Sequence, residues 1–204
     1  MVQVIYTNRR LEELIMAYEI EIIEGHDPSS YFWFNPARVD GEEKDLIYDE
    51  DIFLLDEEFS IDEGNIECFL WYFFEKYYDV NLYCNKKYYD RVDGCANSKG
   101  FEWYLTDNFY KYDIVKRMLA EISEAADLLE KDFDNEKLKP IKKRFSIFYM
   151  VDYDDPDYIA GDSTNEAIER HKECVIDFYR RFVKRLSNMM DNNPQVDLIS
   201  ICGP

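Results

Sequence analysis

The sequence predicts an α+β protein in which a small, mostly antiparallel sheet packs against two long helices. Three observations support this fold class. Apolar residues recur at helical spacing over about 112–133 and 164–191, alternating segments typical of strands lie in the first half, and an apolar segment at 196–202 ends the chain. Because no internal repeat or flexible linker divides the 204 residues, we expect one domain, strand-rich at 1–105 and helix-rich at 106–204.

Strands of the first half are predicted from alternation and from aromatic content. Residues 2–6 and 18–22 alternate apolar and polar side chains, as half-exposed strands do, and a helical turn or two is expected around 9–17. Residues 31–34, closed by Asn35-Pro36, and residues 52–55 are apolar on both faces, which favours buried strands. Further strands are expected at 81–84, 101–105 and 196–202.

Helices are predicted from apolar stripes. In the 112–133 segment the stripe has the spacing 4-3-4-3-4, and in the 164–191 segment Ser163 and Glu166 match a capping box at the start. A third stripe begins after Gly64, and residues 138–151 fit either a helix or a strand, with the helix preferred. The three stripes are Val115, Leu119, Ile122, Ala126, Leu129, Phe133; Ile168, His171, Val175, Phe178, Phe182, Leu186, Met189; and Ile66, Phe69, Phe73, Tyr77.

The apolar content predicts a folded protein in spite of a net charge of -20. Hydrophobic residues make up 47% of the chain and aromatic residues 17%, well above the composition of disordered proteins. Residues 1–70 hold 19 acidic and 4 basic side chains, whereas the remaining 134 residues hold 25 acidic and 20 basic ones. Residues 40–67, which we call the acidic block, hold 13 acidic side chains and one base, Lys44.

A block of this density is suited to bind a basic protein, because its field steers a cationic partner toward it and matches the partner's charges on contact. Toxin-neutralising immunity proteins and nucleic-acid mimics use this strategy, and the chain is similar to them in charge and size alone. We therefore predict a non-catalytic interaction protein that binds and inhibits a basic protein partner. The predicted contact residues are Asp49, Glu50, Asp51, Asp56, Glu57, Glu58, Asp62 and Glu63.

Aromatic side chains in or beside the block are candidate anchors for such a partner. These are Tyr31, Trp33, Tyr48, Phe53 and Phe59. For Trp33 and Phe53 we expect burial in the core instead, and for Tyr48 the sequence favours neither role. The sequence also leaves open whether two basic clusters, at 137–144 and 180–185, neutralise the block within the same molecule.

The same charge disfavours direct binding of nucleic acid, since neutralising phosphates requires an excess of lysine and arginine. No run of about 18 apolar residues is available to span a bilayer. The five cysteines form no CxxC pair and the first residues lack the apolar stretch of a signal peptide. We therefore expect no membrane association, reduced thiols and a cytoplasmic location.

Metal, cofactor and nucleophile signals are weak. Carboxylates between Asp152 and Asp162 lack the glycine and glutamate of an EF-hand, and His171 with Cys174 supplies too few ligands for zinc, so neither a metal nor a cofactor is expected. His171 is instead expected as a hydrogen-bonded core residue. Cys95 lies near Lys99 in a polar segment, but no histidine is placed to activate it. Two alternative hypotheses remain: an enzyme whose active site is assembled from distant residues without a recognisable motif, and a domain to which the sequence assigns no function.

Overall fold

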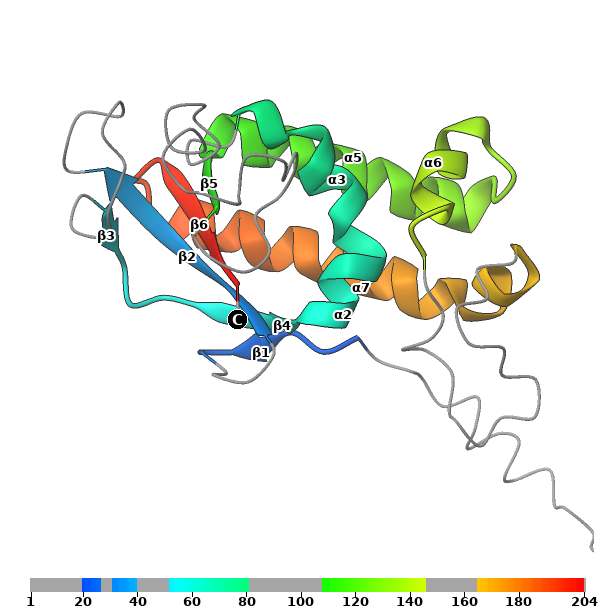
Figure 1. Ribbon diagram of the computed structural model, residues 1–204, viewed down its shortest axis with the longest axis horizontal. Coiled ribbons are helices and arrows are strands. Elements are labelled where there is room, and N and C mark those ends of the chain that lie inside the picture. Colours follow the sequence, from blue (N-terminus) through cyan, green and yellow to red (C-terminus); the bar gives the residue numbers. More distant parts are fainter. Residues whose placement is uncertain (1–19, 27–30, 40–51, 81–107, 146–164, 204) are drawn as a thin grey trace, which may run out of the picture.

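The structure is a computed structural model that describes residues 20–26, 31–39, 52–80, 108–145 and 165–203 (Figure 1). Its strands are β1 (Ile23–Glu24), β2 (Tyr31–Val39), β3 (Ile52–Leu54), β4 (Phe59–Asp62), β5 (Asn108–Lys111) and β6 (Leu198–Cys202). Its α-helices are α2 (Glu63–Asn65), α3 (Trp71–Lys76), α5 (Tyr112–Lys131), α6 (Lys139–Lys142) and α7 (Asn165–Asn192). A π-helix (Ile66–Leu70) joins α2 to α3, and 3-10 turns occupy Tyr78–Val80 and Glu136–Leu138.

The strands form one antiparallel sheet with β2 at its centre. In the part of the chain that the structure describes, the order is β1-β4-β2-β6-β5, and β3 pairs with the far end of β2 on the same side as β4. The C-terminal strand β6 pairs with β2 on one side and with β5 on the other. The predicted α+β fold, with a C-terminal strand returning to an early sheet, is confirmed.

Strand β2 runs through Asn35 and Pro36, where the sequence analysis expected it to end. The register pairs Pro36 with Ile199 of β6, and the Pro36 carbonyl accepts a hydrogen bond from the Leu55 amide at 2.9 Å. In an antiparallel strand the nitrogen and the carbonyl of one residue point to the same side. Since the Pro36 carbonyl faces Leu55, the Pro36 nitrogen also faces residues 55–58, between β3 and β4. A proline is tolerated in this central strand because its missing N–H falls where no ladder bond is made.

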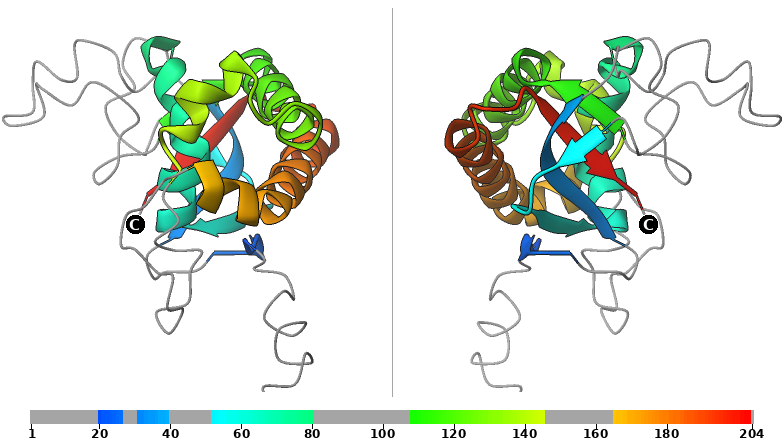
Figure 2. Two further views of the ribbon diagram at one scale, coloured as in Figure 1. Left: turned by 90° about the vertical axis from the view of Figure 1, so that its right-hand side faces the viewer. Right: turned by 90° about the vertical axis from the view of Figure 1, so that its left-hand side faces the viewer.

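One face of the sheet carries the aromatic core. Phe34 on β2 stacks on Phe59 of β4, with ring centroids 4.7 Å apart, and meets Phe182 of α7 edge-on at 5.5 Å. Phe74 of α3 stacks on Tyr110 of β5. Helices α5 and α7 lie side by side over this face and are seen close to end-on in Figure 2. The core therefore joins residues from the early strands to the late helix.

The two long helices agree with the predicted periodicity. Helix α5 covers the expected 112–133 segment to within two residues, and α7 covers the expected 164–191 segment to within one at each end. Every member of the two predicted stripes is buried except Phe133 and His171, which are half-buried. The stripe after Gly64 is helical as well, and the 138–151 segment begins as the short helix α6.

Several expectations are wrong. Residues 20–22 of the expected 18–22 strand are not in a strand, and β1 follows at Ile23–Glu24. Residues 52–55 were expected to be buried, yet Phe53 is 46% exposed and Leu54 38% exposed, because β3 lies at an edge of the sheet. Strands β4 and β5 were not predicted. The expected elements at 2–6, 9–17, 81–84 and 101–105, and the cap residue Ser163, lie outside the described residues.

The π-helix Ile66–Leu70 was also not predicted, and it presents a backbone carbonyl to α7. A π-helix shifts the hydrogen-bond pattern by one residue, which alters how the carbonyls around it are satisfied. The buried Tyr179 hydroxyl donates to the Phe69 carbonyl at 2.7 Å, and burial raises the pKa of Tyr179 well above its usual range. Tyr179 therefore joins α7 to the π-helix as a neutral donor.

Replacement of Tyr179 by phenylalanine is expected to lower the free energy of unfolding by about 1–3 kcal/mol, since it leaves the Phe69 carbonyl buried without its donor. Chemical denaturation of the variant measures the loss. Tyr72→Phe is the matched control, because Tyr72 is a half-buried residue whose hydroxyl makes no hydrogen bond to any residue that the structure describes. Equal losses in the two variants would show that the bond to Phe69 is not stabilising.

Among the residues described, no helix combines the length and the apolar character needed to cross a membrane.

Candidate protein-interaction surface

Part of the acidic block lies in residues 55–58, where the chain leaves the sheet between β3 and β4. The Leu55 amide donates to the Pro36 carbonyl, and the Glu58 carbonyl accepts from the Gly25 amide at 3.2 Å, so both ends of this segment are held. Gly25 has φ of +89°, a conformation that suits glycine and lets the chain turn out of β1 at this contact. These two bonds hold the backbone of Asp56, Glu57 and Glu58 in place between β3 and β4.

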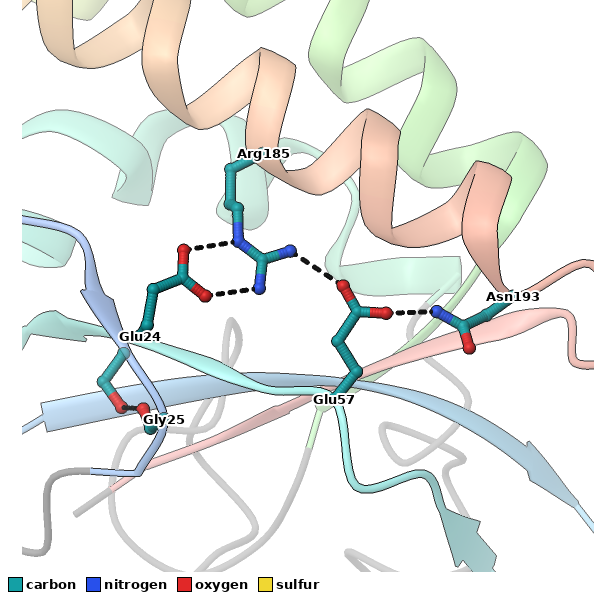
Figure 3. A network of polar contacts seen from close by, with 6 residues as sticks. Glu24, Gly25, Glu57, Arg185 and Asn193 are labelled. Atoms are coloured by element: carbon teal, nitrogen blue, oxygen red, sulfur yellow. Dashed lines mark hydrogen bonds and ion pairs between the residues drawn. The ribbon is translucent and has the colours of Figure 1, made fainter.

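Arg185 of α7 binds two of the chain's carboxylates (Figure 3). Its Nε and Nη2 donate to the two oxygens of Glu24 at 2.8 and 2.7 Å, and its Nη1 donates to Glu57 Oε1 at 3.0 Å. The guanidinium also lies 5.0 Å from the centre of the Phe59 ring. With a side chain only 20% exposed, Arg185 ties β1 and the β3–β4 segment to the late helix.

Glu57 is held on its other side by the turn that follows α7. Asn193 Nδ2 donates to Glu57 Oε2 at 2.6 Å and to the Met189 carbonyl at 2.8 Å. The Tyr112 hydroxyl donates to the Asn193 carbonyl at 3.2 Å. Burial first, and then the negative charges of Asp197 and Glu57, raise the pKa of Tyr112 to about 12. The β3–β4 segment, the start of α5 and the end of α7 thus meet at one place.

Two further acidic residues, which the sequence alone does not associate with the block, lie in the segments that border this place. Asp191 lies in the last turn of α7, two residues before Asn193, and Asp197 accepts a backbone hydrogen bond from Tyr112 at 2.8 Å. Both residues are exposed. They lie more than 120 residues from the acidic block, so no local pattern could associate them with it. We call Asp56, Glu57, Glu58, Asp191 and Asp197 the acidic end of the molecule.

The predicted contact residues do not form one uninterrupted array. Asp56 is exposed, Glu57 binds Arg185 and Asn193, and Glu58 accepts from the buried Asn35 amide at 3.2 Å. Asp62 and Glu63 lie at the other end of β4, where the Asp62 carboxylate caps α2 by accepting from Gly64 and Asn65 amides at 2.9 and 3.3 Å. Asp49, Glu50 and Asp51 lie outside the described residues.

An exposed aromatic residue lies beside the acidic end. The structure places Phe53 on β3, 46% exposed, with the Arg38 guanidinium 4.8 Å from its ring centre. Its expected burial is therefore wrong. Trp33 is half-buried against the His26 ring at 4.1 Å, Phe59 is fully buried, and Tyr48 lies outside the described residues. Leu54 and Phe53, two and three residues before Asp56, are the exposed large apolar residues closest to it in sequence within the described part of the chain.

The basic clusters pair mainly with carboxylates outside the acidic block. Between described residues, the cluster at 137–144 forms ion pairs with Glu75, Glu124 and Glu136. Arg180 pairs with Glu130 and Asp127, and Arg181 pairs with Asp177. Arg185 reaches the block at Glu57. Most of the paired basic residues are thus neutralised by carboxylates outside the acidic block. Among these ion pairs, only the one between Arg185 and Glu57 involves the block.

Groups that could support catalysis do not converge in the described residues. No set of three histidine, cysteine or acidic side chains there is arranged to hold a metal ion. A small cavity between β6 and helices α3, α5 and α7 is lined by apolar side chains, including Phe74, Ile122 and Phe182. Cys174 donates to the His171 carbonyl at 2.9 Å, and burial raises its pKa to about 11, which disfavours a reactive thiolate. Cys95 and the 152–162 carboxylates lie outside the described residues.

Fold and surface together define an α+β protein with an antiparallel sheet, two long helices on one face of it, and a concentration of carboxylates beside an exposed edge strand. No protein-family model, curated protein or solved structure matches the chain significantly.

Proposed function

We propose that this chain is a non-catalytic interaction protein that binds a basic protein partner in the cytoplasm through its acidic end, and inhibits that partner by covering its basic surface. The observation that carries the proposal is the position of Phe53 and Leu54, exposed on β3 next to the carboxylates of residues 56–58. Tight interfaces commonly place an aromatic or aliphatic anchor among charged residues that exclude water around it.

The electrostatics of the described residues support this proposal. Because the basic clusters pair largely with helical carboxylates, they offset little of the charge at Asp56, Asp191 and Asp197. The network around Arg185 holds Glu57 in place, so part of the surface is ordered before a partner arrives. Preorganised side chains lose less conformational entropy on binding, which favours affinity.

Reversal of charge at the acidic end is expected to slow association by about tenfold at low salt and to flatten its salt dependence, because long-range steering is lost. The test variant is Asp56→Lys with Asp191→Lys, since both carboxylates are exposed and neither forms an ion pair with a described residue. The wild-type chain captures proteins from lysate of the source organism at low and high salt, and association rates are then measured for each captured basic protein.

The matched control is Asp134→Lys with Glu169→Lys, which changes the net charge equally at two other exposed positions. We expect the control to retain the partner that the Asp56/Asp191 variant loses. Equal loss in both variants would show that total charge matters and the acidic end does not. Capture that is insensitive to salt would contradict an electrostatic interface.

A further inference from the structure

Strand β3 has one edge that no strand of the described chain covers. It pairs with β2 through Arg38↔Phe53, with Val39↔Ile52 and Ala37↔Leu54 on either side. The Leu55 amide bonds the Pro36 carbonyl, and hydrogen-bonded pairs alternate along an antiparallel ladder, so Phe53 directs its backbone groups toward β2. Ile52 and Leu54 therefore direct their N–H and C=O groups to the outer edge, where no strand of the described residues pairs with them.

The side chains of this edge are accessible too. Phe53 and Leu54 lie on opposite faces of the sheet and are 46% and 38% exposed. β3 lies at the left-hand side of the molecule in Figure 1 and is turned toward the viewer in the right-hand view of Figure 2. Natural proteins usually protect an edge strand by charge, proline or covering, because exposed edges pair with other chains. Within the described part of the chain no strand covers this apolar edge, which points to a binding use.

Charge indicates what the edge binds. Asp56 and Glu57 follow Leu54 by two and three residues. The Asp197 carbonyl accepts from the Tyr112 amide, and the Tyr112 hydroxyl donates to Asn193, which holds Glu57. A second copy of this chain would bring two acidic ends together, and like charges would oppose that pairing. An extended segment rich in lysine or arginine would instead gain both backbone hydrogen bonds and ion pairs.

We propose that β3 binds an extended basic segment of the partner as an additional strand of the sheet. This inference rests on the proposed function and adds how the partner is held. Strand addition draws affinity from main-chain hydrogen bonds and specificity from alternating side chains. Phe53 on one face and Leu54 on the other supply apolar contacts, while cationic side chains beyond the end of β3 meet the acidic end.

The test uses a soluble hexapeptide that alternates lysine and valine, with three companions. One is the same peptide methylated on every backbone nitrogen, which keeps the charge but removes the donors. Another replaces lysine by glutamate. The third is the protein variant Leu54→Pro, compared with Leu54→Ala. Residue 54 makes no ladder bond to β2, so proline removes the outward N–H while leaving the β2–β3 pairing in place.

We expect the lysine peptide to bind, and the methylated peptide and the Leu54→Pro variant each to weaken binding by about tenfold, the effect of losing one or two hydrogen bonds. Leu54→Ala should weaken it less. The peptide should also slow hydrogen exchange at the Leu54 amide. The methylated peptide keeps the inference testable on the wild-type chain even where Leu54→Pro fails to fold.

The outcomes separate this inference from the proposed function. Equal binding of the methylated and unmethylated lysine peptides would overturn strand addition while leaving charge-based binding intact. Equal binding of the glutamate and lysine peptides would overturn the charge argument that selects a basic segment. Binding of neither lysine peptide, with an intact fold, would count against both proposals.

Discussion

Replacement of Phe182 by alanine is expected to lower the free energy of unfolding by about 3–5 kcal/mol, a large part of the stability of a domain of this size. Phe182 is fully buried on α7. Its ring lies 5.5 Å from that of Phe34 on β2 and 6.3 Å from that of Phe59 on β4. The substitution would remove the aromatic contact between the late helix and the early strands and leave a cavity between them.

Chemical denaturation followed by far-UV circular dichroism measures this loss. Phe53→Ala is the matched control, because the same atoms are removed from a side chain that is 46% exposed, and we expect a loss of less than about 1 kcal/mol. A small loss for Phe182→Ala, similar to that of the control, would mean that α7 does not pack on this sheet.

Replacement of Arg185 by methionine is expected to lower the free energy of unfolding by about 1–3 kcal/mol at neutral pH. The guanidinium is mostly buried, and its removal leaves Glu24 and Glu57 close together without a cation. Methionine keeps most of the apolar contact over Phe59, so the measured loss reports mainly on the charge. Arg180→Met is the control, and a smaller loss is expected because that side chain is half exposed.

The same variant carries a prediction about pH. The hydrogen bond from Arg185 holds the pKa of Glu24 below its ordinary value of 4.5. A carboxyl whose pKa is lower in the folded state contributes stability above its unfolded pKa and loses that contribution as the pH falls below it. The difference in stability between wild type and Arg185→Met should therefore be constant at neutral pH and shrink as the pH falls below about 4.5. A difference that does not change with pH would exclude the Glu24 pair as its source.

The long elements were predictable because each carries its own periodicity. The stripes of α5 and α7 repeat over five or more turns, so one face is distinguished from the other without knowledge of its neighbours. Strand β4 was hidden because Phe59-Ser-Ile-Asp62 follows three consecutive acids, and β5 has four residues that run directly into a helix. Short strands of this kind are stabilised by their partners rather than by their own pattern.

The candidate surface also contains residues that the sequence located and residues that only the structure located. The sequence alone located the acidic block and its excess of carboxylates, and Asp56, Glu57 and Glu58 remain in the acidic end. It could not show that Asp191 and Asp197 join them, since that depends on α7 ending beside residues 55–58. It also mispredicted Phe53, because apolar residues on an edge strand have the same composition as those on a central one.

The sequence by itself determined the α+β class, the extents of the two long helices and the concentration of negative charge, because composition and periodicity are local properties. Tertiary structure decided that β3 is an edge strand, that the central strand β2 can contain Pro36, and which distant segments bring their carboxylates to the acidic end. Those outcomes depend on pairings such as Pro36 with Ile199 and Glu57 with Arg185. Such pairings join residues more than a hundred positions apart, and their energies come from contacts that no local window contains.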